Sequence, residues 1–342
     1  MQTRLFGAIA ASVLLLATAG GATAAAKSGG GGCDAACLKD VANKYLDALG
    51  AHNRKADVLA SNVRYTENGV ELKLPDGLWR TASNITGYRL WVPDPSTGTI
   101  GFFSVMQENG APVLLSTRLK VVGRKVTEAE AVIARTGANA GPGSNGTARA
   151  SELGAQSRPA FSEVLKPSER RSRPEMIRIA NTYFTGLENN DGTKVPPFAA
   201  NCHRLENGSA TTNRPIPPGG KPSSATMGCT AAFSAGYYRE DTRLRDRRAL
   251  AVDEEHGLVF ARVFFDHDAT VRSYKLKDGT TNTVRNTGPW TWMIHEIFQI
   301  RDGKIGQVEA ILLSVPYGMK PGWTSGGVAM PSIQEQKEMA GR

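Results

Sequence analysis

The chain carries one pattern twice, and this duplication limits its fold more than any other feature. A helix-like stretch from Ala42 to Leu49 is followed by residues 62–69, which read Asn-Val-Arg-Tyr-Thr-Glu-Asn-Gly. The same order returns from Ala180 to Leu187, followed by residues 201–208, which read Asn-Cys-His-Arg-Leu-Glu-Asn-Gly. Because order and spacing are both kept, the sequence predicts a duplicated domain whose copies differ at a few polar positions.

The displacement between equivalent residues grows in two steps along the chain. It is 138 to 139 residues for the first helix and the Glu-Asn-Gly motif, 159 for Arg89 and Arg248, and 179 for Lys125 and Lys304. The second copy therefore contains two insertions of about twenty residues each. These insertions cover 212–228, which is rich in Pro and Gly, and a lengthened hairpin around 278–288.

The N-terminus reads as a secretory signal. Arg4 precedes an apolar run over 5–19, and Ala24-Ala25-Ala26 offers a cleavage site before Lys27. The run is short for a membrane span, so an N-terminal anchor is the weaker alternative, and no other segment approaches the ~20 apolar residues that a span needs. We therefore expect a periplasmic or secreted protein with no membrane contact after cleavage.

The charge pattern argues against nucleic acid as a partner, and the cysteine spacing argues against a metal site. The net charge is +9, but the arginines are scattered and no basic block is interleaved with aromatics, so nucleic acid is not an expected partner. Four cysteines in an exported chain favour disulfides, and no zinc-type spacing is present, so no metal site is expected. Of the three pairings we prefer Cys33–Cys37 with Cys202–Cys229; a reduced, buried Cys202 is the alternative.

In both copies helical periodicity comes first and strand-like runs follow, which is an α+β order. Helices are expected over 38–53 and 173–188, and 136–172 reads as a surface linker rich in small and polar residues. We expect a signal peptide (1–26), a first domain (27–135), the linker (136–172), a second domain (173–328) and a tail (329–342). Strand-like runs of the first copy cover 63–74, 90–92, 100–107, 113–122 and 126–134.

These motifs resemble the SnoaL-like group of the nuclear transport factor 2-like superfamily. The octapeptide at 62–69, Pro-Trp-Thr-Trp at 289–292 and Val-Pro-Tyr-Gly-Met at 315–319 look like an uncharacterised tandem family of bacteria and fungi. The resemblance implies two tandem cone-shaped domains, each with helices packed on a curved antiparallel sheet. It also implies acid/base chemistry in a pocket without a cofactor, and homo-oligomers formed through the sheet. Because the superfamily includes non-catalytic binders, the fold does not settle the function.

Candidate catalytic residues lie where the second copy diverges. Arg64 of the first copy becomes His203, and Glu108 becomes His267, which follows Asp266, while Glu206 is kept. A histidine beside a carboxylate can exchange protons near neutral pH. We therefore expect the catalytic residues to be His203, Glu206, Asp266 and His267.

Strand geometry argues against direct contact within these His/carboxylate pairs. On an ideal strand His203 and Glu206 point to opposite faces, as do Asp266 and His267, so a bulge would be needed to join either pair. Arg204 shares a face with Glu206 more easily, which favours a structural ion pair. A hydrogen-bonded structural role for His203 is therefore the alternative reading.

The aromatic residues of the second copy suit a flat, hydrophobic ligand, although an ordinary core is the alternative for most of them. Tyr317 could instead contact a second subunit.

We expect His256 to be solvated and His295 to lie on either face of its strand, and Glu130 and Glu309 to be exposed. Arg89 and Arg248 are expected to hold a carboxylate of their own domain. The expected substrate-binding residues are Tyr65, Glu67, Asn207, Tyr238, Trp290, Trp292 and Tyr317.

The sequence therefore predicts a lyase or isomerase of acid/base type, needing no cofactor, that acts on a hydrophobic, aromatic small molecule. Dehydration and formaldehyde release are the versions that the resemblance implies. No nucleophilic-serine elbow, phosphate loop or dinucleotide fingerprint is present. The alternative is a non-catalytic module for small-molecule binding or oligomerisation.

Overall fold

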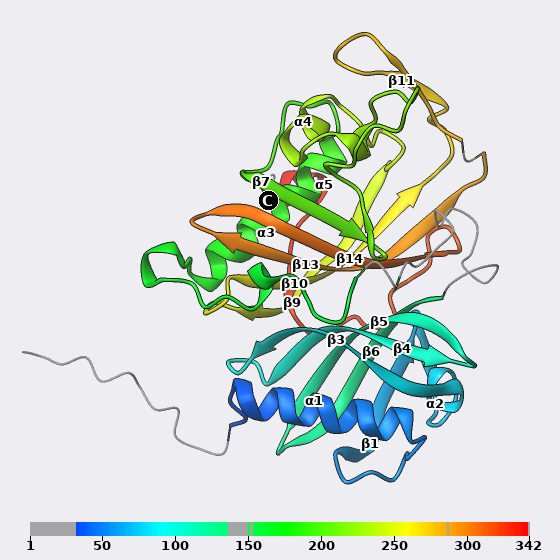
Figure 1. Ribbon diagram of the computed structural model, residues 1–342, viewed down its shortest axis with the longest axis vertical. Coiled ribbons are helices and arrows are strands. Elements are labelled where there is room, and N and C mark those ends of the chain that lie inside the picture. Colours follow the sequence, from blue (N-terminus) through cyan, green and yellow to red (C-terminus); the bar gives the residue numbers. More distant parts are fainter. Residues whose placement is uncertain (1–31, 136–149, 151–152, 286, 341–342) are drawn as a thin grey trace, which may run out of the picture. The chain divides into compact units, whose positions relative to one another are not determined.

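The first half of the structure is one curved sheet with a helix across it. The computed structural model describes residues 32–135, 150, 153–285 and 287–340 (Figure 1), so the expected signal peptide lies outside the described residues. The sheet has the order β2-β1-β6-β5-β4-β3, with β1 and β6 parallel and the other pairs antiparallel. Its elements are α1 (Ala35–Gly50), β1 (Leu59–Glu67), β2 (Val70–Leu72), α2 (Leu78–Thr81), β3 (Ala82–Asp94), β4 (Thr99–Glu108), β5 (Ala111–Val122) and β6 (Lys125–Arg135).

The second half repeats this arrangement with additions. Its main sheet has the order β15-β9-β10-β13-β14-β7-β8, which matches the first sheet strand for strand apart from β15 (Val328–Ala329) at the edge. The expected α+β class is therefore confirmed, with one parallel pair in each sheet. The other elements are α3 (Arg173–Asn189), β7 (Phe198–Glu206), β8 (Ser209–Ala210), α4 (Cys229–Ser234), β9 (Arg243–Asp253), β10 (Leu258–His267), β11 (Ser273–Lys275), β12 (Thr281–Thr283), β13 (Trp290–Arg301), β14 (Lys304–Val315) and α5 (Ile333–Ala340).

Local chemistry explains where the first helix begins and where the repeated strand turns. Asp34 accepts a hydrogen bond from the Cys37 backbone N–H at 2.8 Å, so α1 begins at Ala35 rather than at the expected residue 38. The expected run over 63–74 is a hairpin, because Asn68 and Gly69 both have positive φ. Asn68 Oδ1 also accepts from the Ile133 N–H at 2.8 Å, which ties the hairpin to β6.

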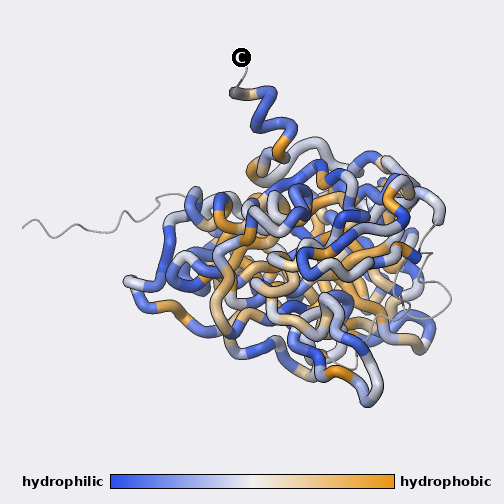
Figure 2. The backbone as a smooth tube through the Cα atoms, turned by 90° about the horizontal axis from the view of Figure 1, so that it is seen from above, coloured by the Kyte–Doolittle hydropathy of each residue, from blue (hydrophilic) through white to orange (hydrophobic). Residues whose placement is uncertain are grey.

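Each sheet buries one face under its own helix and the opposite face against the other sheet. A separate apolar cluster contains residues of both sheets, including Phe103 and Leu114 of the first and Phe260 and Ile297 of the second. The Phe103 and Phe260 rings meet edge to face, with their centroids 6.1 Å apart. Hydrophobic segments gather toward the middle of the molecule, whereas the helix α5 near the C-terminus is mostly hydrophilic (Figure 2).

This sheet–sheet contact overturns the expectation that Glu130 and Glu309 are exposed. They are 0% and 2% exposed, because the outer face of each last strand is covered by the other sheet. Glu130 binds Arg118 Nε at 3.0 Å and Arg262 Nη1 at 2.8 Å. Burial opposes its ionisation, but His295, Arg262 and Arg118 hold the pKa of Glu130 well below its usual range.

The described part of the expected linker is not a free surface strand. Arg158 Nη2 donates to the Val308 carbonyl at 3.1 Å, and Phe161 and Leu165 are buried. The chain after β14 also returns to the first half, where Trp323 Nε1 donates to Thr66 Oγ1 at 2.7 Å. Among the helices of the described residues, none is long and apolar enough to cross a membrane.

Both preferred disulfides, Cys33–Cys37 and Cys202–Cys229, are formed. The second joins β7 to α4 and so anchors the first insertion, while the second insertion forms the separate β11–β12 hairpin.

Three smaller expectations, for His256, Arg89 and Arg248, were wrong. His256 is mostly buried and lies 2.8 Å from Asp253 through its Nδ1. Arg89 and Arg248 bond backbone carbonyls, such as those of Tyr88 and Gly326, rather than carboxylates.

Candidate active site

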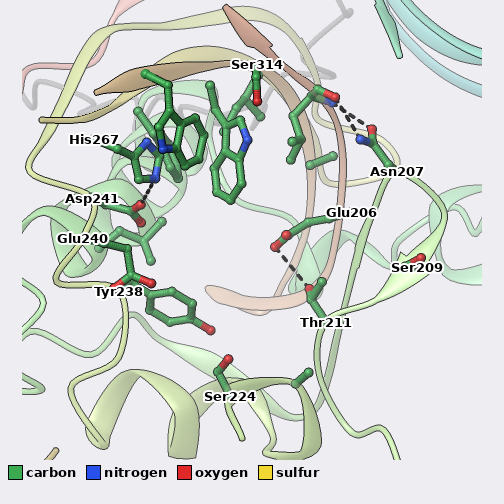
Figure 3. Close-up of a pocket in the computed structure, with 18 of the residues that line it drawn as sticks. Glu206, Asn207, Ser209, Thr211, Ser224, Tyr238, Glu240, Asp241, His267 and Ser314 are labelled. Carbon is green, nitrogen blue, oxygen red and sulfur yellow. Dashed lines mark hydrogen bonds and ion pairs between the residues drawn. The ribbon is translucent and has the colours of Figure 1, made fainter. Parts of the chain in front are cut away.

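A cavity of about 680 Å³ lies on the helix-covered side of the second sheet. Strands β7, β10, β13 and β14 form its floor and sides, and both insertions line it, through Ser224 of the first and Asn282 of the second. Figure 3 shows the polar side chains around this space. Its size and its mixture of apolar walls with a few polar groups are typical of small-molecule sites.

His267, the last residue of β10, lines the cavity and is held on two sides. Its Nε2 lies 2.7 Å from Asp241 Oδ1, and its ring stacks on Trp290 with centroids 3.6 Å apart and planes within 9°. Trp292 meets the same ring edge to face at 4.9 Å. The Asp241 contact keeps a proton on Nε2, so Nδ1, which has no partner among the described residues, is left to accept one.

A second carboxyl group lies beside this pair. Glu240 lines the cavity next to Asp241, and its Oε2 accepts a hydrogen bond from the Tyr274 hydroxyl at 2.7 Å. Burial and the neighbouring Asp241 charge raise the pKa of Glu240 above its usual range. Asn282 donates to the Tyr274 hydroxyl at 2.7 Å, so the second insertion positions Glu240 through Tyr274.

A buried ion pair lies on the β7 side of the cavity. Arg204 Nη2 lies 2.7 Å from Glu206 Oε1, and Arg204 Nη1 donates to the Tyr238 hydroxyl at 2.9 Å. Tyr238 has φ of 78°, a left-handed conformation that is costly for a bulky residue. Its backbone is held there by Asn190, which donates to the Tyr238 carbonyl at 3.1 Å, and by the Tyr274 hydroxyl.

Glu296 on β13 is the cavity's most unusual carboxyl group. It is 3% exposed, and its Oε2 has no partner among the described residues. Burial raises the pKa of Glu296 to about 8, with a further rise from the Glu206 charge, against the opposing effects of Arg204 and Tyr183. Glu296 is therefore mostly protonated at neutral pH and can donate a hydrogen bond.

Of the four predicted catalytic residues, the structure brings Glu206 and His267 to the cavity but not His203 or Asp266. His203 points away from Arg204, as strand alternation requires, and shares a hydrogen bond with Thr212 Oγ1 at 3.3 Å. Burial and the charge of Arg158 lower the pKa of His203. It has the hydrogen-bonded structural position that the sequence left open.

Asp266 lies on the opposite face of β10 from His267. Its carboxylate accepts from Arg243 Nε at 2.7 Å, Arg245 Nε at 2.8 Å and Thr291 Oγ1 at 2.6 Å. These three bonds satisfy both oxygens, so Asp266 stabilises the strand ends rather than facing a ligand.

The predicted binding residues separate in the same way. Tyr238, Trp290 and Trp292 line the cavity. Asn207 also borders it, but its amide is committed to both backbone groups of Leu312, at 2.8 and 3.0 Å. Tyr317 is 45% exposed and does not line the cavity.

Tyr65 and Glu67 lie in the first half and do not line the cavity. Glu67 Oε2 accepts from the Tyr65 hydroxyl at 2.9 Å and from the Leu78 N–H at 2.7 Å, and Glu67 Oε1 binds Arg135 at 2.8 Å. These groups therefore bond to each other rather than to a ligand.

Sequence reasoning missed Asp241, Glu240 and Glu296. Asp241 and Glu240 follow a loop, so no periodicity connects them to His267. A usable signal existed for Glu296, because it continues the alternation of Trp290, Trp292 and Ile294 and occurs as a charged residue within a strongly apolar strand. No group of metal-binding side chains occurs among the residues that the structure describes.

One family model and several solved structures match parts of this chain. A family model described as a domain of unknown function (DUF8021) matches residues 169–312, and none of the curated proteins matches. A candidate ketosteroid isomerase from Kribbella flavida is 18% identical over 32% of this chain and 87% of its own, with a TM-score of 0.25. A hypothetical protein of ketosteroid isomerase-like fold from Catenulispora acidiphila is 14% identical over 27% and 83%, with a TM-score of 0.21.

A third solved structure, of a candidate hydroxylase named AclR from Streptomyces galilaeus, is 11% identical over 41% of this chain and 82% of its own. Its TM-score is 0.25. Likenesses at this level carry no information about chemistry, so the function is argued from the cavity itself.

Proposed function

We propose that this protein is an exported acid/base enzyme, a lyase or isomerase that needs no cofactor and acts on a hydrophobic, aromatic small molecule. The observation that carries the proposal is the contact of 2.7 Å between His267 Nε2 and Asp241 Oδ1, beside Glu240 and inside an aromatic-walled cavity. This arrangement combines a proton acceptor with a carboxyl group whose raised pKa favours its protonated form, which can donate a proton.

In the proposed reaction His267 Nδ1 takes a proton from a substrate carbon next to a carbonyl group. Asp241 holds the ring by accepting from Nε2 and stabilises the imidazolium that forms. Protonated Glu240 gives its proton to the substrate, either at a leaving hydroxyl oxygen, which departs as water, or at a new carbon position. The first outcome is a dehydration and the second an isomerisation, and proton exchange with water restores both groups.

The same proposal assigns roles to the segments. Residues 1–26 direct export, which the two disulfides support because such bonds persist in oxidising compartments. The second domain, 173–328, carries the site. The first domain, 27–135, serves as its scaffold, since its Glu67 is committed to hydrogen bonds with Tyr65, Leu78 and Arg135.

The proposal is tested with a panel of aromatic ketones and β-hydroxy ketones in deuterium oxide without added cofactor. We expect deuterium to enter the carbon next to the carbonyl, or water to be eliminated, in at least one compound, as followed by nuclear magnetic resonance. Binding of these compounds without exchange, elimination or release of an aldehyde would instead favour the non-catalytic binding module.

A further inference from the structure

Several buried polar atoms around the cavity lack a partner. Unpartnered buried side-chain atoms occur in five cavity residues of the described chain. Buried polar atoms in native proteins are almost always hydrogen-bonded, so each such group calls for a partner. All five residues line the cavity, so a ligand bound there is the group best placed to supply that partner. The unpartnered atoms are Arg204 Nε, His267 Nδ1, Trp292 Nε1, Glu296 Oε2 and Ser314 Oγ.

These atoms form two groups at separate ends of the cavity floor. Trp292 and Ser314 are direct partners across β13 and β14, and the His267 ring lies 4.9 Å from that of Trp292. Glu296 lies four residues further along β13, on the side of Arg204 and Glu206, whose charges act on it.

The floor between the two groups is apolar. Ile294 and Leu312 are direct partners on β13 and β14, midway between Trp292 and Glu296, and both line the cavity. At about 3.3 Å per strand residue, the two groups are separated by roughly 13 Å of backbone. This separation suits two linked rings with a polar atom at each far end.

We infer that the cavity takes an elongated ligand with a flat apolar middle and a neutral oxygen at each end, one held by Trp292 and Ser314 and the other by Glu296 and Arg204. Oxygen fits because Trp292 Nε1 and Arg204 Nε can only donate, which excludes an ammonium group at either end. The inference rests on the proposed function, since it assumes that this cavity is the functional site.

Binding of three probes tests this geometry: 4,4′-dihydroxystilbene, 4-hydroxystilbene and stilbene. They share one apolar frame and differ only in the number of terminal oxygens. Each hydroxyl should tighten the Kd by roughly tenfold, as expected for one hydrogen bond to a buried group. Equal affinities for the three probes, or no binding of any of them, would overturn the inference.

Variants assign each oxygen to its end. W292F keeps a ring but loses the donor, so the diol should bind about as weakly as wild type binds 4-hydroxystilbene. 4-Hydroxystilbene, which can use the Glu296 end, should change by at most about twofold. E296L should act in the same way at the other end, and the double variant should bind all three probes alike.

Two further variants supply a control and an independent check at the Trp292 end. W91F, in the first half, is the matched control and should leave all three affinities unchanged, while S314A repeats the test at the Trp292 end with a smaller change of volume. If W292F weakens stilbene as much as the diol, the indole only provides packing and the inference is wrong. Because binding is measured without turnover, discrimination among the probes with no proton exchange would remove the proposed function and leave this inference standing.

Discussion

Ser116 Oγ lies 2.8 Å from His295 Nδ1, and these two residues occupy equivalent positions in the two repeats. They are 179 positions apart, the displacement that also relates Lys125 to Lys304. A residue meets its own equivalent only near a twofold axis, so the two halves face each other as subunits do in an isologous dimer.

This relationship changes what can be expected of assembly. The resemblance implied homo-oligomers formed through the sheet, but in this chain the two sheets already cover those faces of each other. The single polypeptide thus contains the contact that two separate subunits would otherwise make.

Glu130, at the centre of this contact, should be essential for stability. The E130Q substitution removes the charge that balances Arg118 and Arg262, both of which are almost fully buried. Leaving buried charges without their partner typically costs about 3–5 kcal/mol of the free energy of unfolding. Urea unfolding of wild type and variant measures this loss.

The matched control is D40N, which breaks the exposed pair between Lys44 and Asp40 on α1. Such surface pairs contribute about 0–1 kcal/mol, so this variant should unfold almost as wild type does. If E130Q were no more destabilising than D40N, the buried cluster would not be holding the halves together.

The disulfide between Cys202 and Cys229 should stabilise the wall of the cavity. It closes a loop with a sequence separation of 27 residues, and loop-closure entropy of that size corresponds to about 3–4 kcal/mol. Replacing both cysteines by serine should lower the free energy of unfolding by about that amount.

The Cys33–Cys37 bond, with a separation of four residues, closes a much shorter loop and serves as the control. Its double serine variant should lose less stability in the same urea titration. An equal loss from both would show that the loop-closure argument does not apply here.

Glu296 should make the protein less stable at high pH. The pKa of this carboxyl group rises from 4.5 to about 8 on folding. A folded-state pKa above the unfolded one means that the native state holds the extra proton, so this contribution is complete below pH 4.5 and is lost as pH rises through about 8.

Free energies of unfolding at pH 5, 7 and 9 measure this effect against E296Q, which cannot ionise. The advantage of wild type over the variant should shrink steadily across that range, by several kcal/mol at most. A constant difference would mean that Glu296 keeps an ordinary pKa.

Tyr274 should act on catalysis through Glu240. Its hydroxyl donates to Glu240 and so partly offsets the rise that burial and Asp241 cause in the pKa of Glu240. In Y274F this offset is gone, the pKa rises further, and the loss of activity at high pH should shift to higher pH.

The shift is read from the pH profile of kcat/KM on whichever panel compound reacts. Y317F is the control, because Tyr317 is exposed and does not line the cavity. A profile of unchanged shape with a merely lower maximum would assign Tyr274 a structural role only.

Much of the fold was predictable because the chain repeats itself. The helix over 173–188 and the Asp-Gly turn at 302–303 were readable from capping and turn chemistry, and the preferred Cys202–Cys229 pairing, one of three that the sequence left open, is formed. The parallel pairing of β1 with β6 was not readable, because neighbours in a sheet need not be neighbours in sequence.

The site was less predictable, for a related reason. Comparing the two copies predicted both His203 and His267 as catalytic residues, since divergence does not reveal which face of a strand a residue occupies. The partner of His267 comes from a loop before β9, and its approach to within 2.7 Å depends on tertiary packing. The exposure expected of Glu309 failed because a sequence cannot show that one sheet will cover another.

The most direct test of the account compares H267A with H203A in the proton-exchange assay. Both variants remove one imidazole, but only His267 lines the cavity and contacts Asp241. Removing a positioned base typically slows proton transfer by about 10²–10⁴-fold. We expect that loss in H267A and a rate within about threefold of wild type in H203A; wild-type exchange in H267A would contradict the account.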